Sequence, residues 1–323
     1  MRRLARAIAV AAACFIPAAA CAYPDKPVTF IVPFSAGGDA DLAGRNLGAA
    51  AQALLKQPVV VVNKAGASGA IGSQFVKDAG ADGHTLLIAR VGSNAVLPAL
   101  RPATTYKWND FTFLGLLELN PVVCVVHPES PYRTLDDLGK ALRAQPGKLN
   151  YSSSGIGTIL HLGSLLLMQA FKADADAATH IAYKGGSEAA LAVVSHDVDF
   201  SCGNLTSAIG LLKGGKLRAL VVTTPERVKD IPDVPTAREL GYPQLEAIVG
   251  WSALYGPPGM SREAVARWTE VLAAVAKDPQ WLAGEERIGS IPRILTPAET
   301  ERFVGEQFRT YEALGKRLGL KID

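Results

Sequence analysis

The sequence lacks a long hydrophobic run beyond its N-terminus. Residues 7–16 form the apolar core of the first 22 residues, and this run is shorter than the roughly 20 residues that span a membrane. The apolar core is preceded by three basic residues, Arg2, Arg3 and Arg6, and Ala20-Cys21-Ala22 resembles a small-residue cleavage site. We therefore predict that residues 1–22 are a signal peptide cleaved near Ala22 and that the protein is exported to the periplasm. Lipid anchoring at Cys21 is the less favoured alternative.

The sequence also lacks an excess of charge. It has 33 basic and 30 acidic residues, and the predicted signal peptide contains three arginines but no acid, so the remainder is balanced. A balanced chain argues against nucleic acid or an anionic membrane as partner. Any affinity for anions must then come from a local site.

Cysteines are scarce. Of the four, only Cys124 and Cys202 lie outside the predicted signal peptide, each in a strand-like segment. In an oxidising compartment they could pair if their strands are neighbours, but two buried thiols are the favoured interpretation.

Catalytic and cofactor motifs are missing. The segment 66–70, GASGA, lacks the last glycine of a nucleophile elbow, and neither a Walker A nor a dinucleotide fingerprint occurs. The five histidines are not spaced with a second ligand as in a metal site. We therefore expect no cofactor, no metal and no enzymatic activity.

The sequence does contain a strand that passes through glycines into a helix, in residues 28–45. The turn holds Phe34, Ser35, Gly37 and Gly38. Unpaired N–H groups at the helix start and the helix dipole favour an anion, and the glycines allow a ligand close to the backbone. Asp41 is unusual at such a site: it could complement the dipole, orient Ser35 or accept from the ligand through water.

The second half of the chain repeats this pattern. A strand at residues 148–153 leads through Ser153, Ser154, Gly155 and Thr158 into a helix at 159–171. Hydroxyls and amides of this kind hold a carboxylate by charge-assisted hydrogen bonds. We expect the two turns to face each other across a cleft. His161, one turn into the second helix, contacts either the ligand or a neighbouring loop.

Further candidate residues follow other strands. Arg90 comes directly after an apolar strand and could clamp a second carboxylate, although a structural role is the alternative. Ser93 and Asn94 lie in the next turn, and Asn204 lies in the turn after the strand at 198–202. Tyr183 could line the pocket or belong to the core.

Strands alternate with helices in both halves, which indicates an α/β protein with parallel sheets. We expect two lobes with the ligand at the carboxyl ends of the strands, and two hinge crossings, at residues 118–121 and before a late strand at 247–255. The first lobe would comprise residues 23–120 and 225–323, and the second residues 121–224.

In their order along the chain, these motifs resemble the substrate-binding proteins of tripartite tricarboxylate transporters, the Bug-type periplasmic receptors. The resemblance begins with Pro33-Phe34-Ser35-Ala36-Gly37-Gly38 and the Asp41, Ala43 and Arg45 that follow. Further similar segments are 63–72, DGHTLL at 82–87, PGKLNY at 146–151, 155–162, YKG at 183–185, GKLRAL at 215–220 and DVPT at 233–236.

This resemblance implies a type II, flytrap-like receptor that binds a small carboxylate with both cleft loops. It further implies delivery of the ligand to a two-component membrane permease driven by an ion gradient. We also expect the protein to be a monomer. Gly203 stands where the family often has an aspartate before Asn204. The loss of that acid removes a partner for an ammonium group, so we expect a dicarboxylate or an aromatic carboxylate without an amine.

A secreted α/β hydrolase or lyase is the alternative function. It would use Ser153 or Ser154 with His161, but the sequence offers no evident third group to orient the histidine.

Overall fold

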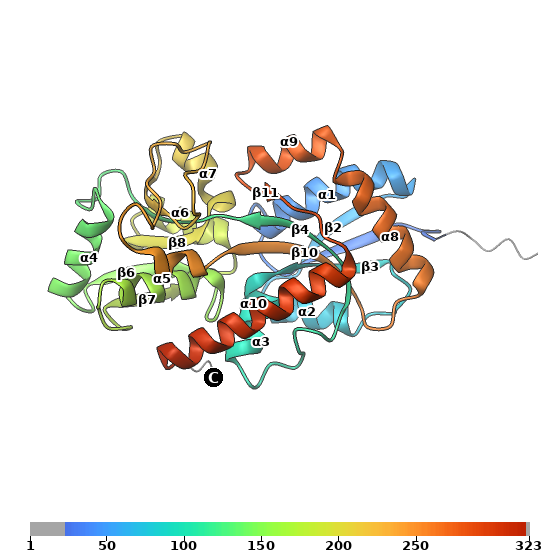
Figure 1. Cartoon of the computed structure of the whole chain (residues 1–323), viewed down its shortest axis with the longest axis horizontal. Coiled ribbons are helices and arrows are strands. Elements are labelled where there is room, and N and C mark those ends of the chain that lie inside the picture. The colour runs from blue at the N-terminus through green and yellow to red at the C-terminus, as the bar shows by residue number, and fades with distance from the viewer. Residues whose placement is uncertain (1–22, 321–323) are drawn as a thin grey trace, which may run out of the picture.

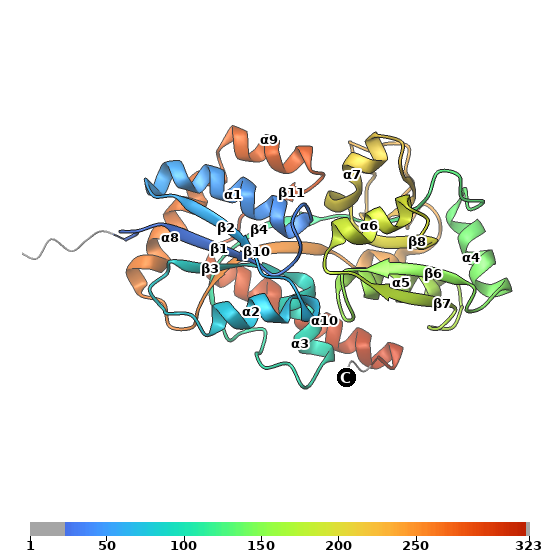
Figure 2. The same ribbon diagram turned by 180° about the vertical axis from the view of Figure 1, so that it is seen from behind.

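The computed structural model describes residues 23–320. The predicted signal peptide, its cleavage site and Cys21 lie outside the described residues. The described chain forms two lobes side by side, each built on one β-sheet with helices on its faces (Figure 1). Seen from behind, the same two lobes are joined by extended segments (Figure 2). Among residues 23–320, none of the helices combines the length and the apolar character needed to cross a bilayer.

The first lobe contains a six-stranded sheet with the order β11-β4-β10-β3-β1-β2. Its strands are β1 (Val28–Val32), β2 (Val59–Asn63), β3 (Thr85–Arg90), β4 (Thr112–Asn120), β10 (Gly250–Gly256) and β11 (Ile291–Pro292). Its α-helices are α1 (Asp39–Leu55), α2 (Ala70–Lys77), α3 (Leu97–Leu100), α8 (Arg262–Val275), α9 (Pro279–Arg287) and α10 (Pro297–Leu318). Short helical segments are η1 (Ala67–Gly69), η2 (Gly92–Val96) and η3 (Pro243–Ala247), the last near the second lobe.

The second lobe contains a five-stranded sheet with the order β7-β6-β8-β5-β9. Its strands are β5 (Val122–Val126), β6 (Leu149–Ser153), β7 (Ala178–Ala182), β8 (Phe200–Asn204) and β9 (Arg218–Val222). Its helices are α4 (Leu135–Ala144), α5 (Ile159–Ala170), α6 (Gly186–Val194) and α7 (Leu205–Lys213).

Local sequence explains where several elements begin. All five residues of β5 are buried and β-branched or cysteine, as expected for a strand inside a covered sheet. Thr134 and Asp137 form a capping box at the start of α4. Thr296 and Glu299 form another at the start of α10, which has proline at its first position.

The disulfide between Cys124 and Cys202 corrects the favoured expectation of two buried thiols. The two cysteines are direct partners in the antiparallel register of β5 and β8. Sequence could not show that these strands are neighbours, because the pairing depends on topology. The bond fastens the strand that enters the second lobe to the strand that ends at Asn204.

The sheets are mixed, which corrects the expectation of parallel sheets. In each lobe the strand that crosses from the other lobe runs against its neighbours: β10 is antiparallel to β3 and β4, and β5 to β8 and β9. β11 also pairs with β4 in the antiparallel direction, whereas the β1–β2, β1–β3, β6–β7 and β6–β8 pairs are parallel.

The crossings are tighter than the sequence indicated. β4 continues through Glu118 to Asn120, so Pro121 alone separates it from β5. Polar residues at this point predicted a loop, but Glu118 and Asn120 are buried and paired with β10. β8 extends to Asn204, two residues beyond the strand predicted at 198–202. Neither α9 nor β11 was predicted from the sequence.

Candidate functional site

The ends of β1, β3, β6 and β8 meet between the two lobes. Between them lies a partly open cavity of about 10 Å³. The lining residues are Phe34, Asp39, Arg90, Val91, Gly92, Ser154, Thr158, Ile159, Leu160 and Asn204. The structure thus brings together five of the sequence-predicted site residues, from both lobes: Phe34, Arg90, Ser154, Thr158 and Asn204.

The first turn packs against the start of α6, and its Phe34 lines the cavity together with Ser154 and Thr158 of the second turn. The Ser35 N–H donates to the carbonyl of Lys184 at 3.3 Å, and Ser187 donates from Oγ to the carbonyl of Ala36 at 3.2 Å. A Cβ at Gly185 would lie 2.0 Å from Ser35 Oγ, so only glycine permits this approach. Gly38 is buried against the backbone of Gly186 and Ser187, whereas Gly37 is exposed and does not contact the second lobe.

Asp41 holds the first turn from the side of its own lobe. Its carboxylate accepts from the Gly37 N–H at 2.9 Å, from Arg45 at 2.9 and 3.0 Å, and from Asn63 at 3.0 Å. Burial alone would raise the pKa of Asp41, but these hydrogen bonds outweigh it and lower the pKa. Asp41 is thus oriented to shape the turn, and it does not line the cavity.

The second turn is held by its own hydroxyls. Ser153 Oγ accepts from the Gly155 N–H at 3.0 Å, and Thr158 Oγ1 donates to the Gly155 carbonyl at 2.8 Å. Gly155 has a φ of 123°, which side chains rarely adopt. From the first lobe, Ser68 Oγ donates to the carbonyl of Ile156 at 2.7 Å. Ser153 and Gly155 support the turn from behind the cavity.

His161 also lies behind the second turn. Its Nδ1 accepts from the Gly157 N–H at 3.2 Å, and its ring stacks on His180 with centroids 4.4 Å apart. Burial lowers the pKa of both histidines to about 4, and for His161 the neighbouring His180 adds to the effect. His180 Nε2 lies 2.5 Å from Ser153 Oγ.

The neutral histidine pair predicts a loss of stability in mild acid. The pKa values of both histidines are lower in the folded protein than in the unfolded chain, where they are near 6.5. Their contribution to the free energy of unfolding is therefore complete above pH 6.5 and falls as the pH drops toward 4. After allowing for partial exposure of both rings, we expect the free energy of unfolding to fall by about 2 kcal/mol between pH 7 and pH 4.5. Urea unfolding of wild type and His161→Gln checks this: the variant should show a weaker pH dependence, and identical slopes would refute the assignment.

Arg90 is buried at 2% exposure and is paired inside the protein. Its Nη2 donates to Asp39, and its Nη1 donates to Ser252 and, at 3.4 Å, to Glu118. Asp39 Oδ2 also accepts from Asn204 Nδ2, which belongs to the second lobe. A carboxylate of the protein therefore joins Arg90 of one lobe to Asn204 of the other.

The same network extends to the crossing strands. Ser252 of β10 donates to Glu118 of β4. Glu118 lies beside Glu285 of α9, and burial together with this neighbouring carboxylate raises the pKa of Glu285 far above its usual range. Glu285 therefore keeps its proton at neutral pH. The hydrogen-bonded groups connect the cavity to both strands that join the lobes.

The remaining predicted residues are Ser93, Asn94 and Tyr183. Ser93 and Asn94 are fully buried and hold the turn after β3: Ser93 Oγ donates to Asn94 Oδ1 at 2.7 Å, and that oxygen accepts from the Arg90 N–H at 3.2 Å. Tyr183 lines a separate groove of about 360 Å³ that also contains Ser68 and Ile156. Ser93, Asn94 and Tyr183 therefore do not line the cavity between the lobes.

Sequence reasoning missed Asp39 and Ser207. It placed the start of α1 near Asp41, but the helix begins at Asp39, so the earlier acid is the one at the cavity. Within residues 23–320, the buried oxygens of Ser35 Oγ, Asn204 Oδ1 and Ser207 Oγ have no hydrogen-bond partner. Ser207 and Asp39 both lie near Gly186 at the start of α6, as contacts of a Cβ built there show. Unsatisfied polar groups in such a place are suited to a polar ligand.

Two other hollows flank the cavity. A second cavity of about 10 Å³ inside the second lobe shares Leu160 and Asn204 and is otherwise lined largely by small and apolar side chains. A much larger groove, about 830 Å³, lies where α7 and the loop after β9 face α9 and β11. This groove contains none of the site residues predicted from the sequence. We therefore assign the site to the cavity that Phe34, Arg90 and Asn204 line, although its volume is smaller.

Comparison with known proteins shows the family to which the chain belongs. Residues 44–320 match the model of the tripartite tricarboxylate transporter family receptor. Protein BugT of Bordetella pertussis is 30% identical over 95% of this chain and 93% of its own length. MatC from Rhodopseudomonas palustris, solved with bound malate, is 29% identical and covers 90% of this chain and 99% of its own, with a TM-score of 0.85. Rpa4515 of the same organism, solved with adipate, is 27% identical with a TM-score of 0.88, over 93% of this chain and 99% of its own.

The hydrolase alternative has no support in the geometry. The hydroxyl of Ser153 is bonded to His180, whereas the Nδ1 of His161 accepts from a backbone N–H. The two-lobed α/β fold and the family match instead point to ligand capture. The chain belongs to the tripartite tricarboxylate transporter receptor family and is a solute-binding receptor, not an enzyme.

Proposed function

We propose that this receptor captures a small organic carboxylate between its lobes, with dicarboxylates and aromatic carboxylates favoured. The observation that carries the proposal is the position of the Asp39 carboxylate, held by Arg90 from one lobe and Asn204 from the other. Because Arg90 and Asn204 donate hydrogen bonds to one carboxylate between the lobes, the same donors can bind a carboxylate of the ligand. The malate and adipate in the two similar structures support this ligand class.

One ligand carboxylate would take the place of Asp39 at Arg90 and Asn204. The other would be bound near the start of α6, where Ser35 and Ser207 have unsatisfied hydroxyls. N–H groups at this helix start add a further anion-binding element. The two positions together favour a ligand with two acidic groups.

The lobes must open to admit such a ligand. The cavity of about 10 Å³ is large enough for about one water molecule. Lobe contacts at Ser35, Ser68 and Asn204 would have to break, after which the lobes close on the ligand as in hinged binding proteins. The segment after β9 packs on the second lobe, because Thr236 pairs with Val222 and Ile231 belongs to the apolar core around Val123. We therefore propose that one moving lobe comprises residues 23–120 and 249–320, and the other residues 121–248, which moves the boundary expected after residue 224.

The expectation that the ligand has no amine stays a prediction. It rested on Gly203 replacing an acid, but Gly203 lines the neighbouring cavity inside the second lobe, and it is Asp39 that supplies a carboxylate to the ligand cavity. We retain dicarboxylates because Arg90 neutralises Asp39 in the observed state. Comparison of malate with aspartate tests the point directly, since the two differ chiefly in an amine.

We further propose that the chain acts in the periplasm as a monomer. Its N-terminal pattern fits a signal peptide removed near Ala22, and its family consists of periplasmic receptors. It would deliver the ligand to a two-component membrane permease driven by an ion gradient, as the family name and the sequence resemblance support.

A thermal-shift screen of organic acids tests the proposal. A ligand at 100 times its dissociation constant stabilises the native state by about 2.7 kcal/mol, which raises the melting temperature by about 5 °C or more. We expect this shift with dicarboxylates or aromatic acids, and a smaller one with the amine-bearing analogue. If none of the acids stabilises the protein, the proposed function is wrong.

A further inference from the structure

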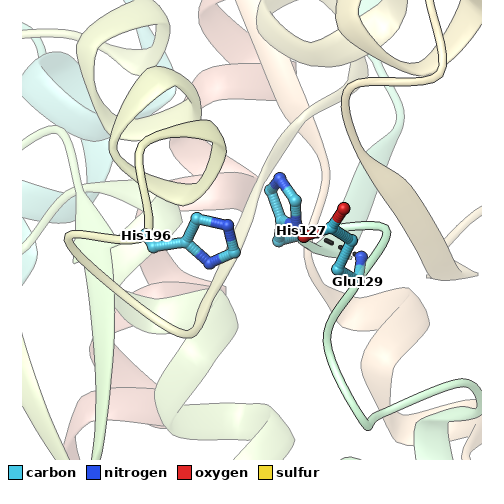
Figure 3. A group of neighbouring side chains, drawn as sticks. All are labelled: His127, Glu129 and His196. Carbon is cyan, nitrogen blue, oxygen red and sulfur yellow. Dashed lines mark hydrogen bonds between the residues drawn. The ribbon is translucent and has the colours of Figure 1, made fainter.

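Three side chains with metal-binding chemistry meet at the end of the second lobe that is remote from the ligand cavity (Figure 3). His127 directly follows β5, Glu129 comes two residues later, and His196 lies in the turn between α6 and β8. The strands β5 and β8 are antiparallel, with Val126 opposite Phe200 at this end and Val122 opposite Asn204 at the cavity end. The cluster and the cavity are therefore at opposite ends of the same strand pair.

The spacing of the histidines along the sequence indicated no metal site, because His127 and His196 are far apart in the chain. The antiparallel pairing brings them together, with ring centroids 3.8 Å apart. One donor atom from each of His127, Glu129 and His196 lies within 4.8 Å of the other two. Ligands on a tetrahedral zinc ion, with bonds of about 2.1 Å, lie about 3.4 Å apart. Glu129 and His196 are exposed, so small side-chain rotations can close the difference.

The donor set selects a class of metal. Two imidazole nitrogens and one carboxylate oxygen suit Zn²⁺ and similar transition-metal ions, whereas Mg²⁺ and Ca²⁺ prefer oxygen ligands. His127 is half-buried and the other two residues are exposed, so an ion has access from solvent and a coordination position remains for water. The Glu129 N–H donates to His127 Nδ1 at 3.1 Å, which holds the ring beside the carboxylate. A metal bound at Nδ1 would replace that hydrogen bond, and the exposed N–H can turn to water.

We propose that His127, Glu129 and His196 form a binding site for one Zn²⁺-class divalent ion, independent of the carboxylate cavity. Metal ions bind deprotonated ligands, so affinity falls when the imidazoles are protonated in acid. The ion would tie the end of β5 to the turn before β8. It would thereby stabilise the second lobe by linking two segments that are distant in the chain.

Isothermal titration with ZnCl₂ tests the site, using tag-free protein stripped with EDTA and a non-chelating buffer near neutral pH. We expect one ion per molecule, and at least a tenfold loss of affinity in both His127→Ala and His196→Ala. Glu129→Gln should show a smaller loss. His84→Gln is the matched control, because His84 lies in the first lobe beside Asp25 and Asp82 and should leave the affinity unchanged.

Co²⁺ provides a second readout that does not depend on any variant folding correctly. Bound to two imidazoles and a carboxylate in the wild-type protein, it should give the intense visible absorption of four- or five-coordinate cobalt, and added Zn²⁺ should abolish that absorption. The proposal is wrong if the wild type binds no ion at micromolar concentrations. It is equally wrong if both histidine variants bind as tightly as the wild type.

Discussion

Replacement of Arg90 by alanine is expected to weaken the binding of a four-carbon dicarboxylate by about 100-fold. Truncation of one partner in a buried, hydrogen-bonded charge pair costs roughly 2–5 kcal/mol, and 2.7 kcal/mol corresponds to 100-fold. Monocarboxylate analogues should lose less than about tenfold, because they can still use the donors near the start of α6. Titration calorimetry with matched mono- and dicarboxylates measures both effects.

Stability needs separate control in this experiment. Arg90→Ala leaves Asp39 and Glu118 without their cation, and the loss of one partner from a buried pair is strongly destabilising. Arg90→Lys retains the charge but not the planar fork, and should give an intermediate loss of affinity. The double variant Arg90→Ala with Glu118→Gln restores part of the charge balance and should still bind dicarboxylates poorly. Equal weakening of mono- and dicarboxylates would show that Arg90 does not select for a second acid.

Replacement of Asp39 by asparagine is expected to have the opposite effect and to tighten dicarboxylate binding by about tenfold or more. In the observed state Asp39 occupies Arg90 and Asn204, so a ligand carboxylate must displace it. A neutral amide accepts a weaker hydrogen bond from Arg90 than a carboxylate does, and it does not repel the incoming anion. Calorimetry on wild type and Asp39→Asn with malate measures the change.

Asp41→Asn is the matched control for this prediction. It removes the same charge from the same helical turn, but it loosens the turn that Asp41 holds through Gly37 and Arg45. We therefore expect Asp41→Asn to weaken dicarboxylate binding. If both variants tightened binding equally, the cause would be the general loss of negative charge and not the displacement of Asp39. Weaker binding of aspartate by Asp39→Asn, with malate unchanged, would show instead that Asp39 is the partner of an ammonium group.

Elements with strong local signals could be predicted from sequence. The strand predicted at 148–153 and the helix predicted at 159–171 agree to within one residue with β6 (Leu149–Ser153) and α5 (Ile159–Ala170), because the glycine turn between them marks both boundaries locally. The helix α9 was missed although Asp278 caps it and proline follows at its first position. That pairing is a known helix-start signal and could have revealed it.

What depends on distant contacts could not be predicted. Glu118 and Asn120 look like loop residues, and only their pairing with β10 makes them part of a buried strand. Arg90 was expected to be either a ligand clamp or a structural residue, and its pairing with Asp39 and Glu118 depends on three separate segments. The cysteine pairing likewise required the order of strands in the second sheet.

The most direct test is a crystal structure of the receptor, expressed from the full sequence with its predicted signal peptide and crystallised with malate or adipate. We predict one ligand carboxylate between the Arg90 guanidinium and the Asn204 amide, with Asp39 turned away and the lobes closed around the acid. An acid bound in the groove between α7 and α9, with the Asp39 bridge to Arg90 and Asn204 intact, would contradict the account.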